Sequence, residues 1–212
     1  MKMIRLPIDY EQKHDFFMLS TLVTEPYDWK KVFGNSNPIH LEIGSGKGEF
    51  LSVAAARNPN INFIGIELKH KRIVSIMKKL DMNIHRNVRL MELFVDESIS
   101  EKISPGSIAC IYIQHPDPWP KRKHIKNRLI QQSLLDCLSG ILEPGGTIEV
   151  STDHAGYRDW TLSQFKKRED FSSLVPDGYT YEPEEGHVTT YFEIEKRQEG
   201  FEPCFMKYQK VR

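Results

Sequence analysis

Between residues 39 and 57 the sequence has the pattern of a buried strand, a glycine-rich turn and a helix in direct succession. Ile39-His40-Leu41-Glu42-Ile43 is typical of a short buried strand, Gly-Ser-Gly-Lys-Gly follows it, and Glu49–Arg57 has apolar residues at helical spacing. This order is typical of the first unit of a doubly wound α/β sheet. The glycines allow a tight turn and let backbone N–H groups approach a ligand. The segment therefore predicts a ligand site at the carboxyl end of the first strand.

Strand and helix patterns continue to alternate after this unit. Strands are expected at 61–66, 88–91, 108–113 and 147–151, helices at 69–80 and 129–142, and a turn at Pro144-Gly145-Gly146. The run at 108–113 is almost entirely apolar, which is typical of a parallel strand covered on both faces. The predicted fold is a doubly wound α/β sandwich with right-handed crossovers. After about residue 170 we expect strands and loops rather than further βα units.

The first part of the chain has a different character. Residues 1–37 are polar and irregular apart from an apolar patch at 16–19, and Asn35-Ser36-Asn37-Pro38 interrupts the chain. We therefore predict an N-terminal extension, 1–37, followed by one folded domain, 38–212. The extension is expected either to pack on the domain or to contact a substrate.

Composition excludes several classes of protein. No apolar run approaches the ~18 residues of a membrane span, and the N-terminus lacks an apolar signal core, so a cytoplasmic protein without membrane contact is expected. The three cysteines form no CxxC pair and the eight histidines are scattered, so no metal site is predicted. Positive and negative residues number 29 each, so a nucleic-acid partner would have to contact a local basic cluster.

Two acidic residues near the glycine turn indicate which cofactor it holds. The spacing is GxGxG rather than the GxGxxG of dinucleotide sites. Glu42 lies just before the turn, where an anion disfavours a pyrophosphate and favours an ammonium or sulfonium group. Glu67 ends the second predicted strand, where an acid can accept hydrogen bonds from ribose hydroxyls. Each feature alone fits a structural turn or a solvated charge, but together they favour S-adenosylmethionine over NAD. The candidate cofactor residues are Glu42, Gly44, Gly46, Gly48 and Glu67.

A stiff, acid-containing loop follows the strand at 108–113. Its sequence, QHPDPWP, contains three prolines, which fix φ and would hold Asp117 and Trp119 at the edge of the sheet where ligands bind. A proline-rich turn with a packed tryptophan is the structural alternative. The densest basic cluster comes next and suits either phosphate contacts from a nucleic acid or a solvated helix face. It comprises Lys121, Arg122, Lys123, His124, Lys126 and Arg128.

With these segments the chain resembles the bacterial tRNA (guanine-N7)-methyltransferases of the TrmB type. The resemblance is carried by LEIGSGKGEF with Glu67 downstream, by PDPWPKRKH, and by Thr190-Tyr191-Phe192-Glu193, in this order over roughly residues 39–200. It implies a class I S-adenosylmethionine-dependent methyltransferase fold, Rossmann-like, with a seven-stranded, mostly parallel sheet. It also implies methylation at N7 of guanosine 46 in the tRNA variable loop, and it makes 38–212 the methyltransferase domain.

The resemblance further implies roles for individual residues. Asp117 would be the catalytic residue and, with Glu42 and Glu67, an acid of the cofactor site. Substrate contacts would come from Lys121, Asp153, Thr190, Tyr191, Phe192 and Glu193. Two of these positions have a structural alternative: Asp153 as a helix N-cap, and Thr190-x-x-Glu193 as a capping box that opens a short helix.

The chain departs from the family pattern at two places. Gln114-His115 stands where the family usually has Asn-Phe, and Phe94 aligns near the polar residue that would meet adenine. Phe94 is still assigned to the cofactor site. A shift of this loop would instead let Asp96 take the place of the residue that meets adenine.

Three other functions fit parts of the sequence. They are a class I methyltransferase for a small molecule or protein, a non-catalytic RNA-binding protein with a degenerate methyltransferase fold, and a Rossmann dehydrogenase. The basic cluster beside PDPW opposes the first, and the glycine spacing opposes the last. A monomer and a homodimer are equally compatible with the sequence.

Overall fold

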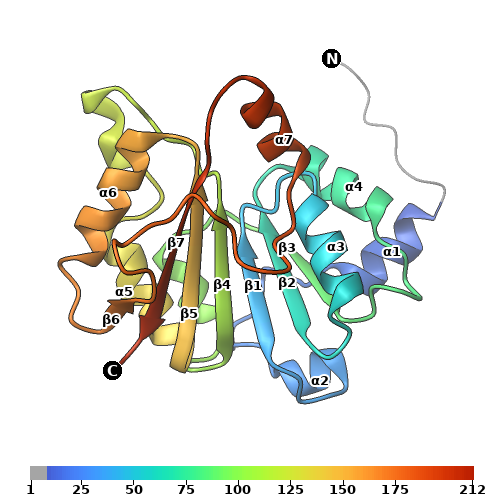
Figure 1. The fold of residues 1–212 in the computed structure, drawn as a ribbon. Coiled ribbons are helices and arrows are strands. Elements are labelled where there is room, and N and C mark those ends of the chain that lie inside the picture. The colour runs from blue at the N-terminus through green and yellow to red at the C-terminus, as the bar shows by residue number, and fades with distance from the viewer. Residues whose placement is uncertain (1–8) are drawn as a thin grey trace.

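A mixed sheet with strand order β3-β2-β1-β4-β5-β7-β6 organises the computed structural model, which describes residues 9–212 (Figure 1). The strands from β3 to β5 in this order are parallel, whereas β7 runs antiparallel to both β5 and β6. The seven strands are β1 (Ile39–Ile43), β2 (Asn62–Glu67), β3 (Val88–Glu92), β4 (Ile108–Gln114), β5 (Leu142–Thr152), β6 (Phe171–Ser173) and β7 (Cys204–Lys210).

Helices cover both faces of this sheet (Figure 1). One face carries α1 (Tyr10–Phe17), α3 (Glu49–Arg57) and α4 (His70–Lys79), and the other carries α5 (Gln132–Ile141) and α6 (Ala155–Phe165). Every residue of β2 is buried, as expected for a central parallel strand. The remaining elements are α2 (Trp29–Phe33), α7 (Tyr191–Gln198) and the short 3₁₀ helices η1 (Glu97–Glu101) and η2 (Arg122–Asn127).

Two apolar clusters form the core, one on each face. Helix α4 buries Ile73, Ile76 and Met77, whose spacing predicted a helix there, and it also buries Val74. Burial of each such side chain stabilises the fold by about 1.5–3 kcal/mol. The expected strands and helices between residues 39 and 142 are confirmed, with ends that shift by at most three residues. None of the helices within residues 9–212 is long and apolar enough to cross a membrane.

The segment 144–146 differs from the expected turn between a helix and a strand. Strand β5 already begins at Leu142, and its register with β4 shifts between Ile108 and Cys110. Gly145 has a φ of 80°, which glycine adopts at little cost. The chain therefore kinks within a longer strand.

No apolar periodicity indicated helix α6, because its buried face includes polar residues. Thr161 is fully buried and donates from Oγ1 to the carbonyl oxygen of Tyr157 at 3.0 Å. The buried Gln164 accepts from Nε2 of Gln132 at 3.0 Å. These hydrogen bonds satisfy polar side chains at positions where an apolar periodicity would otherwise have indicated a helix.

The N-terminal segment, from residue 9 onward, packs on the sheet. Phe17 is fully buried beside α4, and Leu19 donates its backbone N–H to the carbonyl oxygen of Leu90 at 2.8 Å. Nε1 of Trp29 donates to Oγ of Ser107 at 3.2 Å. Packing on the domain is therefore observed for 9–37, while residues 1–8 of the predicted extension lie outside the described part. The division after residue 37 stays a prediction.

Substitution of Gly48 tests how tightly the turn after β1 is packed. A Cβ atom there would lie 2.8 Å from Cγ2 of Ile76, and the φ of 73° disfavours a side chain. We expect Gly48→Ala to lower the free energy of unfolding by about 2–4 kcal/mol in urea denaturation. Gly34→Ala is the matched control, since Gly34 has a φ of 71° but open space around the added atom. Its expected loss is about 1–2 kcal/mol, and equal losses for the two variants would contradict the packing argument.

Candidate functional site

A cavity of about 670 Å³ opens at the carboxyl ends of β1, β4 and β5, at the edge of the sheet where the sequence predicted a site. The glycine turn after β1, the loop after β4, the residues after β5, and α7 line it, together with the start of α3 and Arg72 of α4. Of the predicted site residues, those that line this cavity are Glu42, Gly44, Gly46, Asp117, Asp153, Thr190, Tyr191 and Phe192.

The glycine turn is held by backbone hydrogen bonds to β2. The N–H groups of Gly44 and Ser45 both donate to the carbonyl oxygen of Ile66, at 2.8 and 2.9 Å. Gly44, Gly46 and Gly48 all have positive φ, between 57° and 79°. Gly44 and Gly46 line the cavity, whereas Gly48 turns toward Ile76 and has a packing role.

Glu42 is a buried carboxyl group that lines the cavity. It is 3% exposed, and its Oε2 atom has no hydrogen-bond partner within residues 9–212. The pKa of Glu42 is raised to about 7, mainly by burial. A hydrogen bond from Ser45 opposes this rise, and the nearby charge of Glu67 contributes to it. An unpartnered carboxyl group at a cavity wall fits a ligand with a cationic group.

Glu67 lies behind the turn instead of lining the cavity. Its Oε2 accepts from the N–H of Gly46 at 3.0 Å, and its Oε1 accepts from the N–H of Lys69 at 2.9 Å. Arg72 approaches Oε2 at 3.4 Å. The carboxylate therefore fixes the turn against the end of β2. Contact with ribose hydroxyls through its remaining lone pairs stays a prediction.

The loop after β4 has strained backbone on both sides of Asp117. His115 and Trp119 have φ values of 46° and 41°, the only positive values among non-glycine residues in the described chain. Strain of this kind is held in place by surrounding structure and is common at functional sites. Asp117 lines the cavity between two prolines, as the sequence indicated, whereas Trp119 packs edge-on against His124.

Arg128 anchors this loop. Its Nε donates to the carbonyl oxygen of Pro118 at 3.0 Å, and its Nη1 donates to that of Gly156 at 3.1 Å. The guanidinium is buried beside the rings of Tyr157 and Trp160. Arg128 thus differs from the rest of the basic cluster, in which Lys121 is exposed and lies outside the cavity lining.

Asp153 lines the cavity next to His115. Its Oδ1 lies 3.5 Å from Nδ1 of His115, and this interaction holds the pKa of Asp153 below its usual value against the opposing effect of burial. The N-cap of α6 is His154, whose side chain accepts from the N–H of Tyr157. The N-cap alternative for Asp153 is therefore wrong, because the helix begins one residue later than that alternative requires.

The capping box expected before α7 is formed only in its N-cap half, because the Glu193 carboxylate pairs with other side chains and not with the N–H of Thr190. Thr190 is the N-cap, and its Oγ1 accepts from the N–H of Glu193 at 3.3 Å. The Glu193 carboxylate is buried and does not line the cavity. His187 and Arg197 contact it at 2.7 and 2.8 Å. Burial alone would raise the pKa of Glu193, but these two partners outweigh it and hold the pKa below its usual value.

Phe94 is not brought to the cavity. Its side chain is 61% exposed, and it is absent from the cavity lining. The proposed substitute, Asp96, accepts hydrogen bonds from both the N–H and the hydroxyl of Ser98. Adenine recognition by either residue stays a prediction.

Several residues that were not among the predicted site residues also line the cavity. They are Ser45, Lys47, Glu49, Phe50, Arg72, Gln114, His115, Pro116, Pro118, His154, Glu195, Lys196 and Phe201. Glu49 joins α3 to α7, because its Oε2 accepts from the N–H of Tyr191 at 2.8 Å. Its position as the first residue of a predicted helix gave no signal for this contact. Residues 9–212 contain no group of three or more His, Cys, Asp or Glu side chains that could hold a metal ion.

Known proteins resemble this chain in sequence and in fold. The family model described as "Putative methyltransferase" matches residues 36–202. A Bacillus subtilis protein named tRNA (guanine-N(7)-)-methyltransferase is 39% identical over 139 residues, which cover 66% of this chain and 65% of that protein. A protein of the same name from Geobacter metallireducens is 34% identical over 197 residues, 92% of this chain and 93% of that protein.

A solved structure of the 16S rRNA methyltransferase KamB matches this fold with a TM-score of 0.61 at 12% identity, covering 92% of this chain and 99% of that one. The predicted class I methyltransferase fold is confirmed by this likeness and by the seven-stranded sheet. The family model spans most of the chain, and the Geobacter relative aligns along nearly its whole length. The chain therefore belongs to the family of the bacterial tRNA (guanine-N7-)-methyltransferases.

Proposed function

We propose that this protein transfers the methyl group of S-adenosylmethionine to N7 of a guanosine in tRNA, at position 46 of the variable loop. The observation that carries the proposal is the unpartnered buried carboxyl of Glu42, which shares one cavity with the glycine turn and Asp117. The printed names of the relatives, one of which aligns with over nine-tenths of the chain, support tRNA as the substrate.

The residues of the cavity suit a sulfonium cofactor. When bound, S-adenosylmethionine supplies a methyl group on a positively charged sulfur. Glu42 would pair with a cationic group of the methionine part, and the backbone around Gly44 and Gly46 leaves room for its close approach. This pairing also removes the cost of burying an unpartnered carboxyl group.

The chemistry needs no general base. N7 of guanine carries a lone pair in the ring plane and no proton, so attack on the methyl carbon leaves no proton to remove. The rate therefore depends on alignment and on electrostatic stabilisation. The methylated purine is positively charged. Asp117 would accept hydrogen bonds from N1–H and N2–H of guanine, which fixes the orientation of the base and stabilises the growing charge.

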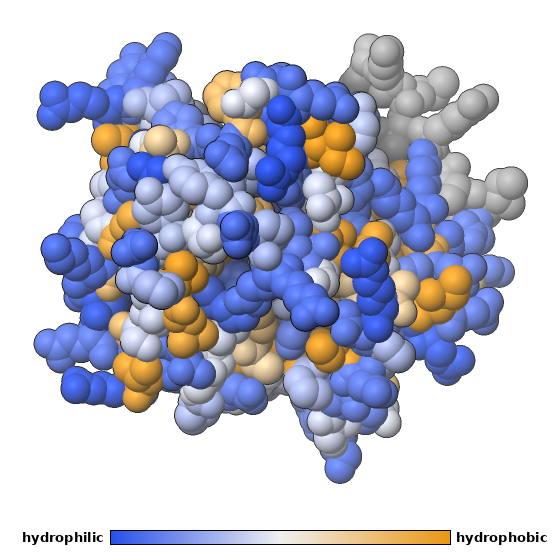
Figure 2. Space-filling view, in the orientation of Figure 1, coloured by the Kyte–Doolittle hydropathy of each residue, from blue (hydrophilic) through white to orange (hydrophobic). Residues whose placement is uncertain are grey.

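Aromatic side chains at the cavity mouth suit an unstacked base. Figure 2 shows hydrophobic residues at the surface around α7, and the exposed ones there include Phe192 and Phe201, which also line the cavity. Lys196 lies 5.7 and 5.2 Å from the centres of these two rings. Stacking on such rings contributes about 1–3 kcal/mol per base. This offsets the cost of taking the guanine out of the tRNA stack.

Replacement of Asp117 tests its role with the substrate. We expect Asp117→Ala to reduce methyl transfer to unmodified tRNA by about 10²-fold, because the developing charge loses its carboxylate. The product is located by N7-specific strand cleavage. Asp177→Ala is the control, since Asp177 is exposed and does not line the cavity. Equal rates for the two variants would remove Asp117 from the mechanism.

The pKa of Glu42 makes cofactor affinity depend on pH. Since the carboxyl must be ionised to pair with a cation, the dissociation constant of S-adenosylmethionine should fall as the pH rises from about 6 to about 8, by at most about tenfold per pH unit. Calorimetry measures this. Glu42→Gln should bind more weakly and with a smaller pH dependence. If the variant kept the slope of the unaltered protein, Glu42 would not be the titrating group.

The raised pKa of Glu42 also makes the stability of the cofactor-free protein depend on pH. The pKa of Glu42 is higher in the folded than in the unfolded chain, so the folded state binds the proton more tightly. Its contribution to stability is present at pH values below the usual glutamate pKa and is lost as the pH rises toward about 7. Bound cofactor should reverse this loss.

Exposed lysines beside the cavity should bind tRNA phosphates. We expect the double variant Lys121→Ala and Lys123→Ala to weaken tRNA binding and to flatten the plot of log affinity against log salt by roughly 0.7–0.9 per removed charge. Lys30→Ala is the control, because Lys30 is exposed on α2 at the opposite end of the sheet (Figure 1). A salt dependence that is unchanged in the double variant would exclude these lysines.

A further inference from the structure

A second cavity, of about 230 Å³, lies against the face of the sheet that carries α3. On this face α1, α3 and α4 lie over the β1–β3 side of the sheet (Figure 1). The neighbouring strands β4, β5 and β7 are crossed there by the chain between β6 and α7, residues 174–190, which we call the strap. Because an extended strap fills less space than a helix, a hollow remains between it and the strands.

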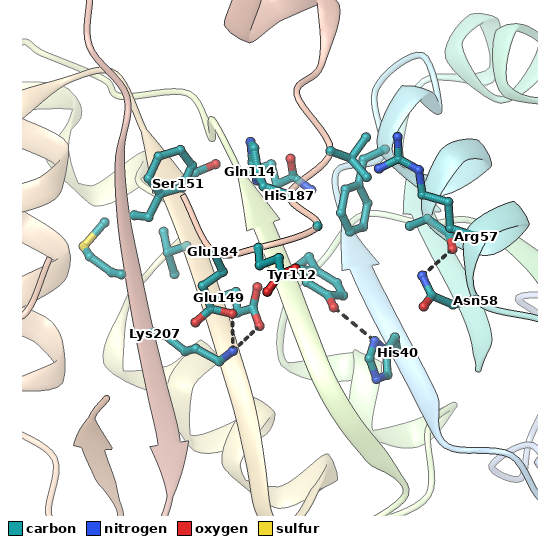
Figure 3. Close-up of a pocket in the computed structure, with 18 of the residues that line it drawn as sticks. His40, Arg57, Asn58, Tyr112, Gln114, Glu149, Ser151, Glu184, His187 and Lys207 are labelled. Carbon is teal, nitrogen blue, oxygen red and sulfur yellow. Dashed lines mark hydrogen bonds and ion pairs between the residues drawn. The ribbon is translucent and has the colours of Figure 1, made fainter. Parts of the chain in front are cut away.

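The strap is fixed over this hollow. The backbones of Thr180 and Phe205 exchange two hydrogen bonds, of 2.9 and 2.7 Å. Glu184 of the strap lies 2.7 Å from Nζ of Lys207, which also contacts Glu149 on β5 at 2.9 Å (Figure 3). The cavity therefore has a defined roof, and its shape is set before any ligand enters.

Aromatic rings line the cavity from two sides. Phe50 and Tyr112 have ring centres 4.7 Å apart on the side of α3 and β4, and His187 and Phe205 have ring centres 5.0 Å apart on the side of the strap and β7. His40 donates to or accepts from the hydroxyl of Tyr112 at 3.1 Å (Figure 3). Planar rings pack favourably against such walls.

A buried hydroxyl in the wall has no partner. Ser151 on β5 is 5% exposed, lines the cavity, and its Oγ makes no hydrogen bond to any described residue. An unsatisfied buried hydroxyl costs free energy that a ligand with a hydrogen-bonding group would recover. This hydroxyl lies outside the glycine turn and outside the loop that carries Asp117, and it favours a ligand that is polar as well as flat.

The charges at the cavity disfavour an anion. The charged residues that line it are Glu149, Glu182, Glu184, Glu185, Arg57 and Lys207. Both Glu149 and Glu184 hold the ammonium of Lys207, so this cation is already neutralised. The excess of carboxylates favours a neutral or positively charged ligand.

We propose that this second cavity binds a small planar heteroaromatic compound, neutral or cationic and about the size of a nucleobase. Its volume exceeds the ~150 Å³ that suffices for benzene in an apolar cavity. Phe50 and Gln114 line both cavities and form their common wall. The second cavity is nevertheless separate from the residues to which we assign methyl transfer. The proposal of a ligand there therefore does not depend on the proposed activity.

Titration followed by methyl NMR tests the proposal on the unaltered protein. Val188 lies in the strap, is buried, and lines the second cavity, whereas no valine lines the first. The probes are 1-methyladenosine, adenosine and adenosine 5′-monophosphate, which are cationic, neutral and anionic. Saturating S-adenosylhomocysteine keeps adenosine from the cofactor site. The valine methyl signals are assigned with the variant Val188→Ala.

We expect the Val188 methyl signals to shift and saturate, while those of Val74, buried in α4 away from the cavity, stay in place. Affinity should fall in the order 1-methyladenosine, adenosine, adenosine 5′-monophosphate, with about tenfold or more between the first and the last. No shift of Val188 at millimolar probe, or binding of the anion as tight as that of the cation, would overturn the proposal.

Removal of the unpartnered hydroxyl tests the polar contact. Ser151→Ala should weaken 1-methyladenosine binding roughly three- to tenfold, the effect of one lost hydrogen bond. Ser139→Ala is the control, because Ser139 is a buried serine on α5 outside both cavities. This variant should keep the affinity of the unaltered protein for 1-methyladenosine. Affinity for S-adenosylhomocysteine, measured in parallel, checks that both variants are folded. Equal probe affinity in the two variants would show that Ser151 does not contact the ligand.

Discussion

The turn between β1 and α3 is the constraint on which the site depends. Its glycines, Gly44, Gly46 and Gly48, all adopt positive φ. The turn is held by backbone hydrogen bonds to Ile66 and by the buried carboxylate of Glu67, which accepts from the N–H groups of Gly46 and Lys69. Because this turn brings α3 close to the end of β1, the carboxyl of Glu42 is cut off from water yet borders the cavity. The same packing thus produces both the backbone cradle and the raised pKa of Glu42.

The loop after β4 illustrates how local strain is supported from a distance. His115 and Trp119 have positive φ, which costs about 1–2 kcal/mol for a non-glycine residue. Two hydrogen bonds offset part of that cost. The N–H of His115 donates to the carbonyl oxygen of Ser151, and Nε of Arg128 donates to the carbonyl oxygen of Pro118. Asp117 is therefore positioned by β5 and α6 as much as by the prolines next to it in sequence.

The sequence predicted those parts of the fold in which the apolar residues follow a clear helical or strand pattern, such as α4 and the strands β1 to β4. Apolar periodicity did not indicate α6, because Thr161 and Gln164 are buried with hydrogen-bond partners that only the folded chain supplies. At the site, Glu42 and Asp117 were identifiable from their place at strand ends. The anchoring role of Arg128 was not, since a basic run in sequence gives no sign that one of its members is buried beside two aromatic rings.

The first turn of α3 connects both cavities with α7. Phe50 forms a wall of each cavity, and the residue before it, Glu49, accepts a hydrogen bond from the N–H of Tyr191 at the start of α7. Any ligand that moves α7 therefore acts on the same turn as a ligand beneath the strap. If the two events favour different positions of Phe50, each weakens the other by the same factor, because coupling between binding sites is reciprocal. Coupling between the two cavities would therefore pass through the packing of Phe50, the residue that both cavities share on α3.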